Sequence, residues 1–108
     1  MPFASTSASA VKCGNRSDGS FAVYRVGHLA WFKCNLIVGG YNSYTAGTTI
    51  ASGFRPSYTV RIPITMMASS NVNGYGWLSI TTSGTINIHT STTSDAEICG
   101  DCWYTIPY

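Results

Sequence analysis

Apolar and polar residues alternate along most of this chain with a period of two. The clearest case is the segment 58–65, in which every second residue is apolar. That period is typical of a half-buried β-strand. The apolar positions are Tyr58, Val60, Ile62 and Ile64, and Thr59, Arg61, Pro63 and Thr65 lie between them. No segment has apolar residues at the helical spacing, so the pattern predicts strands and turns only.

The segment 29–38 differs, because both of its faces carry large apolar side chains. The first face consists of Ala30, Phe32, Cys34, Leu36 and Val38. The second face carries Leu29 and Trp31 beside the charged Lys33. A strand that is apolar on both sides must be covered twice. We therefore expect a second subunit to cover Leu29 and Trp31, the alternative being a loop of the same chain.

Further strands are predicted at about 20–26, 75–82, 85–90 and 102–107, with polar loops over 39–47, 68–74 and 90–94. Residues 1–19 are small and polar, which predicts an N-terminal arm or linker that ends in a turn. Residues 20–108 then form one domain. About six short strands at regular spacing predict an all-β fold, an antiparallel β-sandwich.

Charged residues make up only 9% of the 108 residues, and the net charge is +2. The cations are scattered, whereas binding a nucleic-acid backbone needs clustered ones, so we expect no nucleic-acid partner. No apolar stretch is long enough to span a bilayer, so we expect no membrane insertion. A surface with so few charges suits a protein that buries much of itself in an assembly.

The residues that most often carry catalysis do not form a recognisable motif. Asp95 and Glu97 are two apart, so they would share a face on a strand, but their polar surroundings favour a solvated loop. His28 falls at a predicted turn and His89 on the outward phase of its strand. Nothing combines a nucleophile, a base and an orienting group. We expect a protein that is not an enzyme and has no cofactor.

Cys99 and Cys102 form a C-x-x-C pair, and Cys13 and Cys34 are distant from them in sequence. A closed zinc site needs four ligands, which one such pair does not supply. A thiol on an apolar face, like that of Cys34, behaves as a small hydrophobe. We predict free thiols and no metal. The alternatives are a disulfide, in which Cys13 would fasten the arm, and a metal site.

Two loops have the composition of adaptable binding surfaces. Tyr, Asn, Ser and Gly bind ligands at a low entropic cost, because aromatic faces stack and amides hydrogen-bond. The residues that we expect to line a ligand site are Tyr41, Asn42 and Tyr44 in the first loop and Asn71, Asn73 and Tyr75 in the second. The alternative is that these are ordinary solvent-exposed loops.

A Gly-aromatic-Arg-Pro-Ser turn at 53–57 leads directly into the strand at 58–65. Pro56 fixes its own φ and pushes Arg55 into an extended conformation. We expect Arg55 to be structural, because its five donors can hold neighbouring turn carbonyls.

This turn resembles the G-[YF]-R-P-S turn of the C-terminal head domains of bacteriophage tail-fibre and receptor-binding proteins. The segments 20–32 and 76–88 are similar to two hairpins of that family, and 103–108 is similar to its closing aromatic strand, so the resemblance covers roughly residues 20–108 in order. Ala51 and Ser52 stand where the family often has Leu-Pro.

The resemblance implies a jelly-roll-like head domain that forms a homotrimer and attaches to a host-surface ligand, which we expect to be a saccharide. It implies a place in the virion, at the tail or fibre tip, after assembly in the host cytoplasm. Other virion proteins would dock to the N-terminal arm. The alternatives are a structural virion component without a receptor, such as a capsid decoration or head-fibre knob, and a C1q-like or tumour-necrosis-factor-like trimer. The latter is disfavoured because the N-terminus lacks the pattern of a secretion signal.

Overall fold

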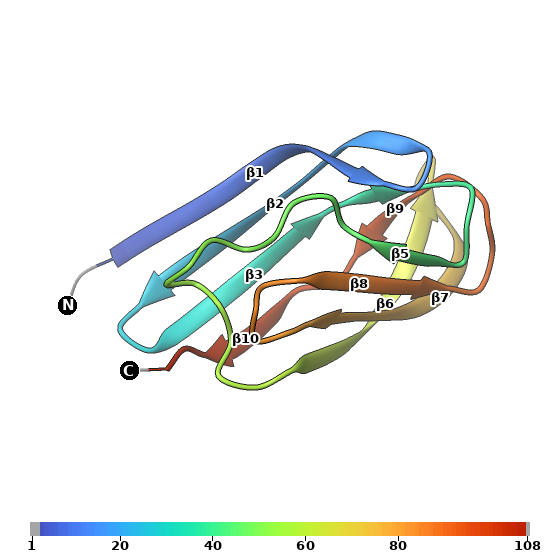
Figure 1. Cartoon of the computed structure of the whole chain (residues 1–108). Coiled ribbons are helices and arrows are strands. Elements are labelled where there is room, and N and C mark those ends of the chain that lie inside the picture. The colour runs from blue at the N-terminus through green and yellow to red at the C-terminus, as the bar shows by residue number, and fades with distance from the viewer. Residues whose placement is uncertain (1–2, 108) are drawn as a thin grey trace.

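The fold is built from strands alone. The computed structural model describes residues 3–107, and its named strands pair antiparallel in two sheets (Figure 1). The strands are β1 (Phe3–Cys13), β2 (Arg16–Val26), β3 (Leu29–Asn35), β4 (Ile37–Val38), β5 (Ser43–Thr45), β6 (Val60–Ala68), β7 (Asn71–Ile80), β8 (Ile86–Thr90), β9 (Ala96–Cys99) and β10 (Cys102–Thr105). The predicted all-β antiparallel sandwich is confirmed. No helix within residues 3–107 is long and apolar enough to cross a membrane.

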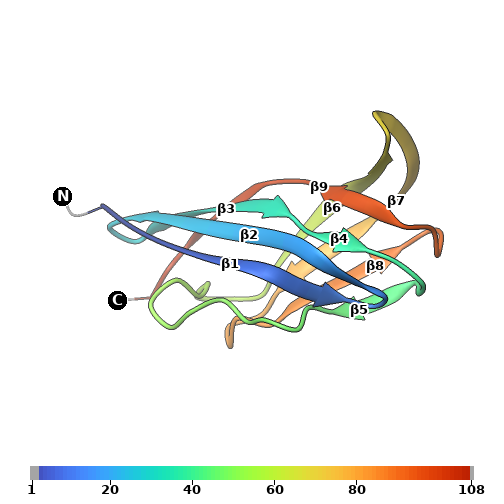
Figure 2. The same cartoon turned by 90° about the horizontal axis from the view of Figure 1, so that it is seen from above.

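The two sheets lie over one another as two layers (Figure 2). One has the strand order β1-β2-β3-β10, and the other has the order β4-β9-β6-β7-β8-β5. Successive side chains of a strand point to opposite faces. Each sheet therefore turns one face towards the shared core and the other outward.

The core takes alternate residues from nearly every strand. The predicted apolar face of segment 29–38 is buried throughout, with Phe32 and Leu36 fully inaccessible. The strands β7 and β8 contribute Leu78, Ile80, Ile86 and Ile88. In the predicted strand 58–65, Ile64 is buried, but Tyr58 precedes β6 and is exposed. The alternation thus identifies the inward face, although not where each strand begins.

The N-terminal segment is not an arm. Phe3–Cys13 forms β1 along the edge of the four-stranded sheet, and the side chains of Val11 and Cys13 are fully buried. The predicted arm or linker over residues 1–19 is therefore wrong for this strand, and residues 1–2 lie outside the described residues. Small residues on both faces, with a bulge between Ala8 and Val11, hide the alternation. An arm that docks to other virion proteins loses its basis.

The predicted strand over 29–38 is two strands in different sheets. β3 ends at Asn35, and the chain crosses at the buried Leu36 to begin β4 at Ile37. Gly19 on β2 permits this crossing, because an added Cβ would lie 2.6 Å from the Ile37 nitrogen. Both strands keep the same inward phase, which is why the sequence pattern looks continuous.

Two predicted loops are largely strand. β6 and β7 form a long hairpin that projects from one end of the sandwich (Figure 2), and its turn is only Ser69 and Ser70, with φ of 49° and 71°. Asn71, predicted in a loop over 68–74, begins β7. Glu97, expected in a solvated loop, lies on the short strand β9 with an exposed side chain.

Candidate functional site

An aromatic cluster lies on the outward face of the six-stranded sheet. Leu78 and Ile80 of β7 point into the core, so Tyr75 and Trp77 point outward. Antiparallel pairing places His89 of β8 opposite Trp77. The Trp77 and His89 rings stack, with centroids 5.6 Å apart and planes inclined by 20°. We call Tyr75, Trp77 and His89 the platform.

The platform remains open to solvent, because Tyr75 is 65% and Trp77 45% exposed. Tyr75 lies two residues before Trp77 on the same strand face, so the two aromatic side chains are neighbours along β7. Pro63 of β6 pairs with Trp77 on the other side and is also exposed. The result is a ridge of ring faces and edges that crosses three strands.

Hydrogen-bonding groups border the platform on β5 and β8. The Ser43 hydroxyl lies 3.3 Å from the Nδ1 of His89. The Thr45 hydroxyl donates to the Asn87 side-chain oxygen at 3.0 Å. That bond orients the Asn87 amide, whose NH₂ group has two donors and no acceptor among residues 3–107. Aromatic surface beside oriented donors can bind a ligand that is apolar on one side and hydroxylated on the other.

The predicted first loop divides between surface and core. Tyr41 and Asn42 are exposed, and the Asn42 amide donates to the Thr90 carbonyl at 3.0 Å. Tyr44 is 5% exposed and belongs to the core. Its ring meets Tyr41 edge-on, and its hydroxyl donates to the Tyr41 carbonyl. Tyr44 therefore fastens the loop, and its side chain is not available to a ligand as predicted.

The predicted second loop extends along the projecting hairpin. Asn71 is exposed near its tip, and the side-chain oxygen of Asn73 is buried without a hydrogen-bond partner. Tyr75 lies at its base, where its amide donates to the Ser91 hydroxyl at 3.0 Å. The structure thus brings Tyr75 close to the β8 end that Asn42 contacts. Asn71 and Asn73 lie nearer the tip of the hairpin, farther from this end of β8 than Tyr75.

Trp77, Asn87 and Ser43 are site residues that sequence reasoning did not select. The predicted hairpin could have identified Trp77 and Asn87, because a turn centred on Ser83 pairs residue 77 with 89 and residue 79 with 87. The outward phase of Trp77 follows from the buried Leu78 beside it. Ser43 reaches the site through β5, a strand of three residues inside the segment 39–47 that was predicted as a loop.

A second aromatic cluster crosses the outward face of the four-stranded sheet. The rings of Phe3 and Tyr24 are 6.2 Å apart, those of Tyr24 and Trp31 are 5.4 Å apart, and those of Trp31 and Trp103 are 6.0 Å apart. Their planes are inclined by 22° to 27°, which is offset stacking. We call Phe3, Tyr24, Trp31 and Trp103 the ladder, which takes one ring from each strand of the sheet.

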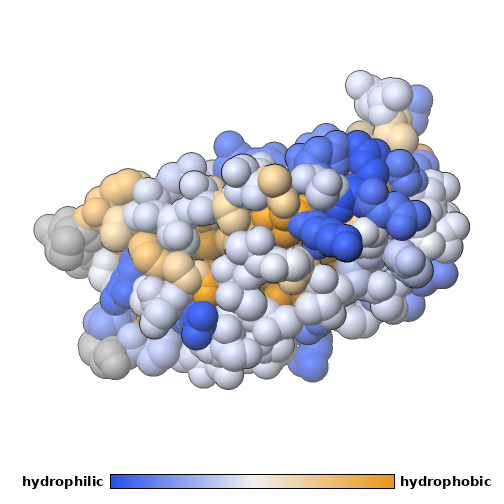
Figure 3. All heavy atoms as spheres, turned by 45° about the horizontal axis from the view of Figure 1, so that its top comes forward, coloured by the Kyte–Doolittle hydropathy of each residue, from blue (hydrophilic) through white to orange (hydrophobic). Residues whose placement is uncertain are grey.

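Val26 and Leu29 border the ladder on one side, and the charged Lys33, which pairs with Ala22, lies in the row on the other side. Val26 and Leu29 pair with one another in the next row of the sheet, and they are 43% and 47% exposed. Figure 3 shows strongly hydrophilic residues at the end with the projecting hairpin and apolar residues towards the opposite end. Pairing in neighbouring rows places Leu29 and Trp31, the predicted subunit contacts, side by side on the same outward face. Loops of the same chain leave Leu29 about half exposed, so they do not supply its cover.

The cysteines are unpaired thiols in the structure, and three of them are buried. Burial raises the pKa of Cys13 and Cys102 to about 11 and that of Cys34 to about 12. Raised pKa values keep thiols protonated and unreactive at neutral pH. Among residues 3–107, no group of three or more His, Cys, Asp or Glu side chains is placed to hold a metal ion.

The remaining candidate polar residues have structural partners. Asp95 pairs with Arg16 at 3.0 Å, and Arg16 also pairs with Asp18, whose pKa this hydrogen bond lowers. The Nε of Arg55 donates to the Ile50 carbonyl at 2.8 Å, and Pro56 beside it is buried. The Arg55 bond closes residues 50–55 into a turn, and the Ile50 amide, which donates to the Gly84 carbonyl at 2.9 Å, fastens this turn to the sandwich. Searches of the chain against protein-family models and against curated proteins returned no match.

Proposed function

We propose that this chain is a saccharide-binding attachment domain of a phage virion, at the tail or fibre tip, and that the platform contacts the host-surface saccharide. The observation that carries this proposal is the exposed Trp77–His89 stack, with Tyr75 beside it and oriented polar groups at its border. It is a binding role without catalysis.

The chemistry of the platform matches that of a sugar ring. A pyranose presents C–H groups on its faces and hydroxyls around its rim. The electron-rich faces of Tyr and Trp attract the C–H groups, while their low flexibility limits the entropic cost of binding. The Asn87 amide donors and the Ser43 hydroxyl lie where rim hydroxyls would need partners. The site crosses three neighbouring strands, which suits a ligand longer than one sugar ring.

The ladder supports the assembly part of the proposal. We assign this face to contacts between copies in a homotrimer, the state that the resemblance to tail-fibre heads implies. Its rings face one another, so their edges and the side chains of Val26 and Leu29 form the outer surface. An exposed apolar and aromatic patch with a few polar groups suits a protein partner. Three platforms in one assembly would raise avidity by about 10²–10⁴ over a single weak contact.

The proposal is tested on an array of bacterial surface polysaccharides, probed with the labelled protein and with Trp77→Ala. We expect the parent to bind a subset of the array and Trp77→Ala to lose that binding without loss of melting temperature. Tyr58→Ala is the matched control, because it removes an exposed aromatic side chain outside the platform and the ladder. It should bind as the parent does.

Retention of binding by Trp77→Ala would refute the platform as the site. If the assembled parent binds no saccharide and labels no bacterial cells, the structural virion component becomes the better assignment, because the ladder alone would then have a role.

A further inference from the structure

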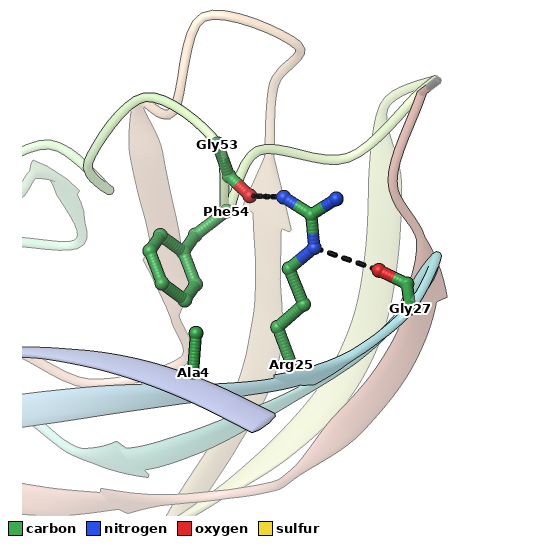
Figure 4. Close-up of a pocket in the computed structure, with 5 residues that line it drawn as sticks. All are labelled: Ala4, Arg25, Gly27, Gly53 and Phe54. Carbon is green, nitrogen blue, oxygen red and sulfur yellow. Dashed lines mark hydrogen bonds between the residues drawn. The ribbon is translucent and has the colours of Figure 1, made fainter. Parts of the chain in front are cut away.

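A pocket of about 260 Å³ opens between the N-terminal end of β1 and the loop that follows β5. Its lining consists of Ala4, Arg25, Gly27, Gly53 and Phe54 (Figure 4). In the close-up, the Phe54 ring and the Ala4 methyl group lie on one side and the Arg25 guanidinium on the other. The pocket is separate from the platform, since no residue is common to both.

Two backbone carbonyls hold the Arg25 guanidinium in place. Its Nε donates to the Gly27 carbonyl at 2.7 Å, and its Nη1 donates to the Gly53 carbonyl. Both glycines have positive φ, of 61° and 91°, a conformation that L side chains rarely adopt. A guanidinium has five donors, so these two bonds leave the Nη2 group without an acceptor among the described residues.

The positive charge of Arg25 has no counter-ion within residues 3–107. Arg16 makes both of the ion pairs found among residues 3–107, and neither involves Arg25. None of the four acidic residues of the chain lines the pocket. Arg25 is half buried, and an arginine stays charged at any ordinary pH. The pocket therefore contains a fixed positive charge with free hydrogen-bond donors, next to the apolar side chains of Ala4 and Phe54.

The loop wall of the pocket is fixed before any ligand arrives. The Tyr104 hydroxyl donates to the Phe54 carbonyl at 2.6 Å, and the Ser57 amide donates to the Thr105 carbonyl at 2.9 Å. Little ordering entropy then remains to be lost on binding. The preorganised arginine favours a planar carboxylate, because such an anion accepts from two guanidinium donors at once.

We propose that this pocket binds the carboxylate of an acidic sugar residue, such as a uronic acid, with the sugar ring against Phe54. This inference rests on the proposed saccharide function and adds a charged subsite to it. It makes the recognised polysaccharide anionic. A neutral sugar of the same shape would leave the cation unpaired, and a carboxylate without the ring would leave Phe54 uncovered.

The test is a titration of ¹⁵N-labelled full chain followed by NMR, with methyl glucuronide as the probe and methyl glucoside as its neutral counterpart. We expect methyl glucuronide at millimolar concentration to shift the amide signals of Gly27 and Gly53 and the Arg25 side-chain signal. Methyl glucoside should leave these signals unchanged. Arg25→Gln keeps one donor for a loop carbonyl and should weaken glucuronide binding by about tenfold or more.

Ala4→Leu keeps Arg25 and its bonds while filling the pocket, so it should also lose the shifts, even if Arg25→Gln fails to fold. Lys12→Gln is the matched control, because it removes one exposed positive charge of the same sheet edge away from the pocket. It should change affinity by less than about twofold, since distant surface charges are screened.

Equal shifts from methyl glucoside, or none from the glucuronide, would overturn the proposal. Acetate binding as tightly as the glucuronide would overturn the assignment to a sugar. Signals of Trp77 and His89 separate this inference from the proposed function. If only they respond to sugars, the pocket is refuted and the platform stands. If only the pocket signals respond, the platform is refuted and the charged site stands.

Discussion

The outward faces of the two sheets both carry stacked aromatic rings across neighbouring strands, yet their surroundings differ. The ladder has Val26 and Leu29 on one side and only Lys33 as a charged neighbour on the other, whereas polar side chains of β5 and β8 border the platform. Rings beside exposed aliphatic side chains offer mainly apolar area to a partner, and area is what a protein interface uses. Rings with oriented donors at the border offer area and direction together, as a hydroxylated ligand requires. The border, more than the rings, decides the class of partner.

Exposure does not distinguish the two faces, because Tyr75 of the platform is 65% exposed. Trp103 at one end of the ladder is 63% exposed and Phe3 at the other end is 64% exposed. Most of the surface of these two side chains stays in water in the single chain, so the fold of one chain buries little of their apolar area. Their burial between copies would contribute about 25 cal/mol for each Å² of apolar area.

The largest expected effect is on assembly. Leu29→Lys with Trp103→Lys places two charges on the ladder face at positions that are exposed in the single chain, so the fold should survive. Buried unpaired charges are costly, and the double variant should therefore remain monomeric. Light scattering coupled to size-exclusion chromatography should show the mass of three chains for the parent and of one chain for the variant.

Trp77→Ala is the control for that experiment and should keep the mass of the parent. A parent that is monomeric at micromolar concentration would remove the distinction between the two faces, because the ladder would then be an exposed surface like the platform.

Two tyrosines sharpen the comparison between surface and core. Tyr44→Ala removes a buried ring and should reduce the free energy of unfolding by about 3–5 kcal/mol. Tyr75→Ala removes an exposed ring and should change it by about 0.5 kcal/mol or less, while weakening saccharide binding. Urea denaturation measures both values. Equal losses of stability would show that Tyr44 is not the fastening residue of its loop.

Arg55 should contribute to the stability of the fold but not to assembly through the ladder or to saccharide binding at the platform. Arg55→Ala leaves the Ile50 carbonyl without its donor, which should cost about 1–3 kcal/mol. The variant should keep the mass of the parent and its saccharide binding in the folded fraction. Unchanged stability with lost binding would move Arg55 from the fold to the site.

The smallest expected effect is a loss of stability at alkaline pH that arises between the two sheets. Burial raises the pKa of Cys34 to about 12 from a usual value of 9.0. The protonated thiol is the form that the folded state favours, so its contribution is complete below pH 9.0 and is lost as the pH rises towards 12. The urea midpoint should fall between pH 8 and about pH 10.5, and less so in Cys34→Ala. An equal fall in both proteins would exclude this thiol as the cause.

The sequence pattern predicts the inward faces well and the ends of strands poorly. Successive side chains of a strand point to opposite faces, so the face that meets the core is visible as every second apolar residue around Phe32 and Ile64. The crossing at Leu36 leaves no mark, because both sheets bury the same phase. β1 was missed because alanine and serine are neither clearly inward nor outward, so burial of Val11 and Cys13 depends on the partner strand.

The candidate site shows a similar limit. Composition drew attention to Tyr75, which is exposed, and to Tyr44, which is buried, because the sequence of a Tyr-Asn-Ser loop is the same whether its ring points inward or outward. The platform depends on the register of β7 and β8, which the short turn fixes. Ser43 lies at the border of the platform only because β5, which is distant in sequence, pairs with β8. Such long-range pairing is a tertiary property, and local pattern does not carry it.

The three tryptophans provide the most direct test of the division between the two faces. Each indole N–H gives its own NMR signal, and a dissolved paramagnetic agent broadens those that reach solvent. In the assembled protein, we predict that Trp31 and Trp103 are protected, although Trp103 is 63% exposed in the single chain, while Trp77 is broadened. Adding the bound saccharide should then protect Trp77 alone. Broadening of Trp103 to the same extent as Trp77, or protection of Trp103 by the saccharide, would contradict the account.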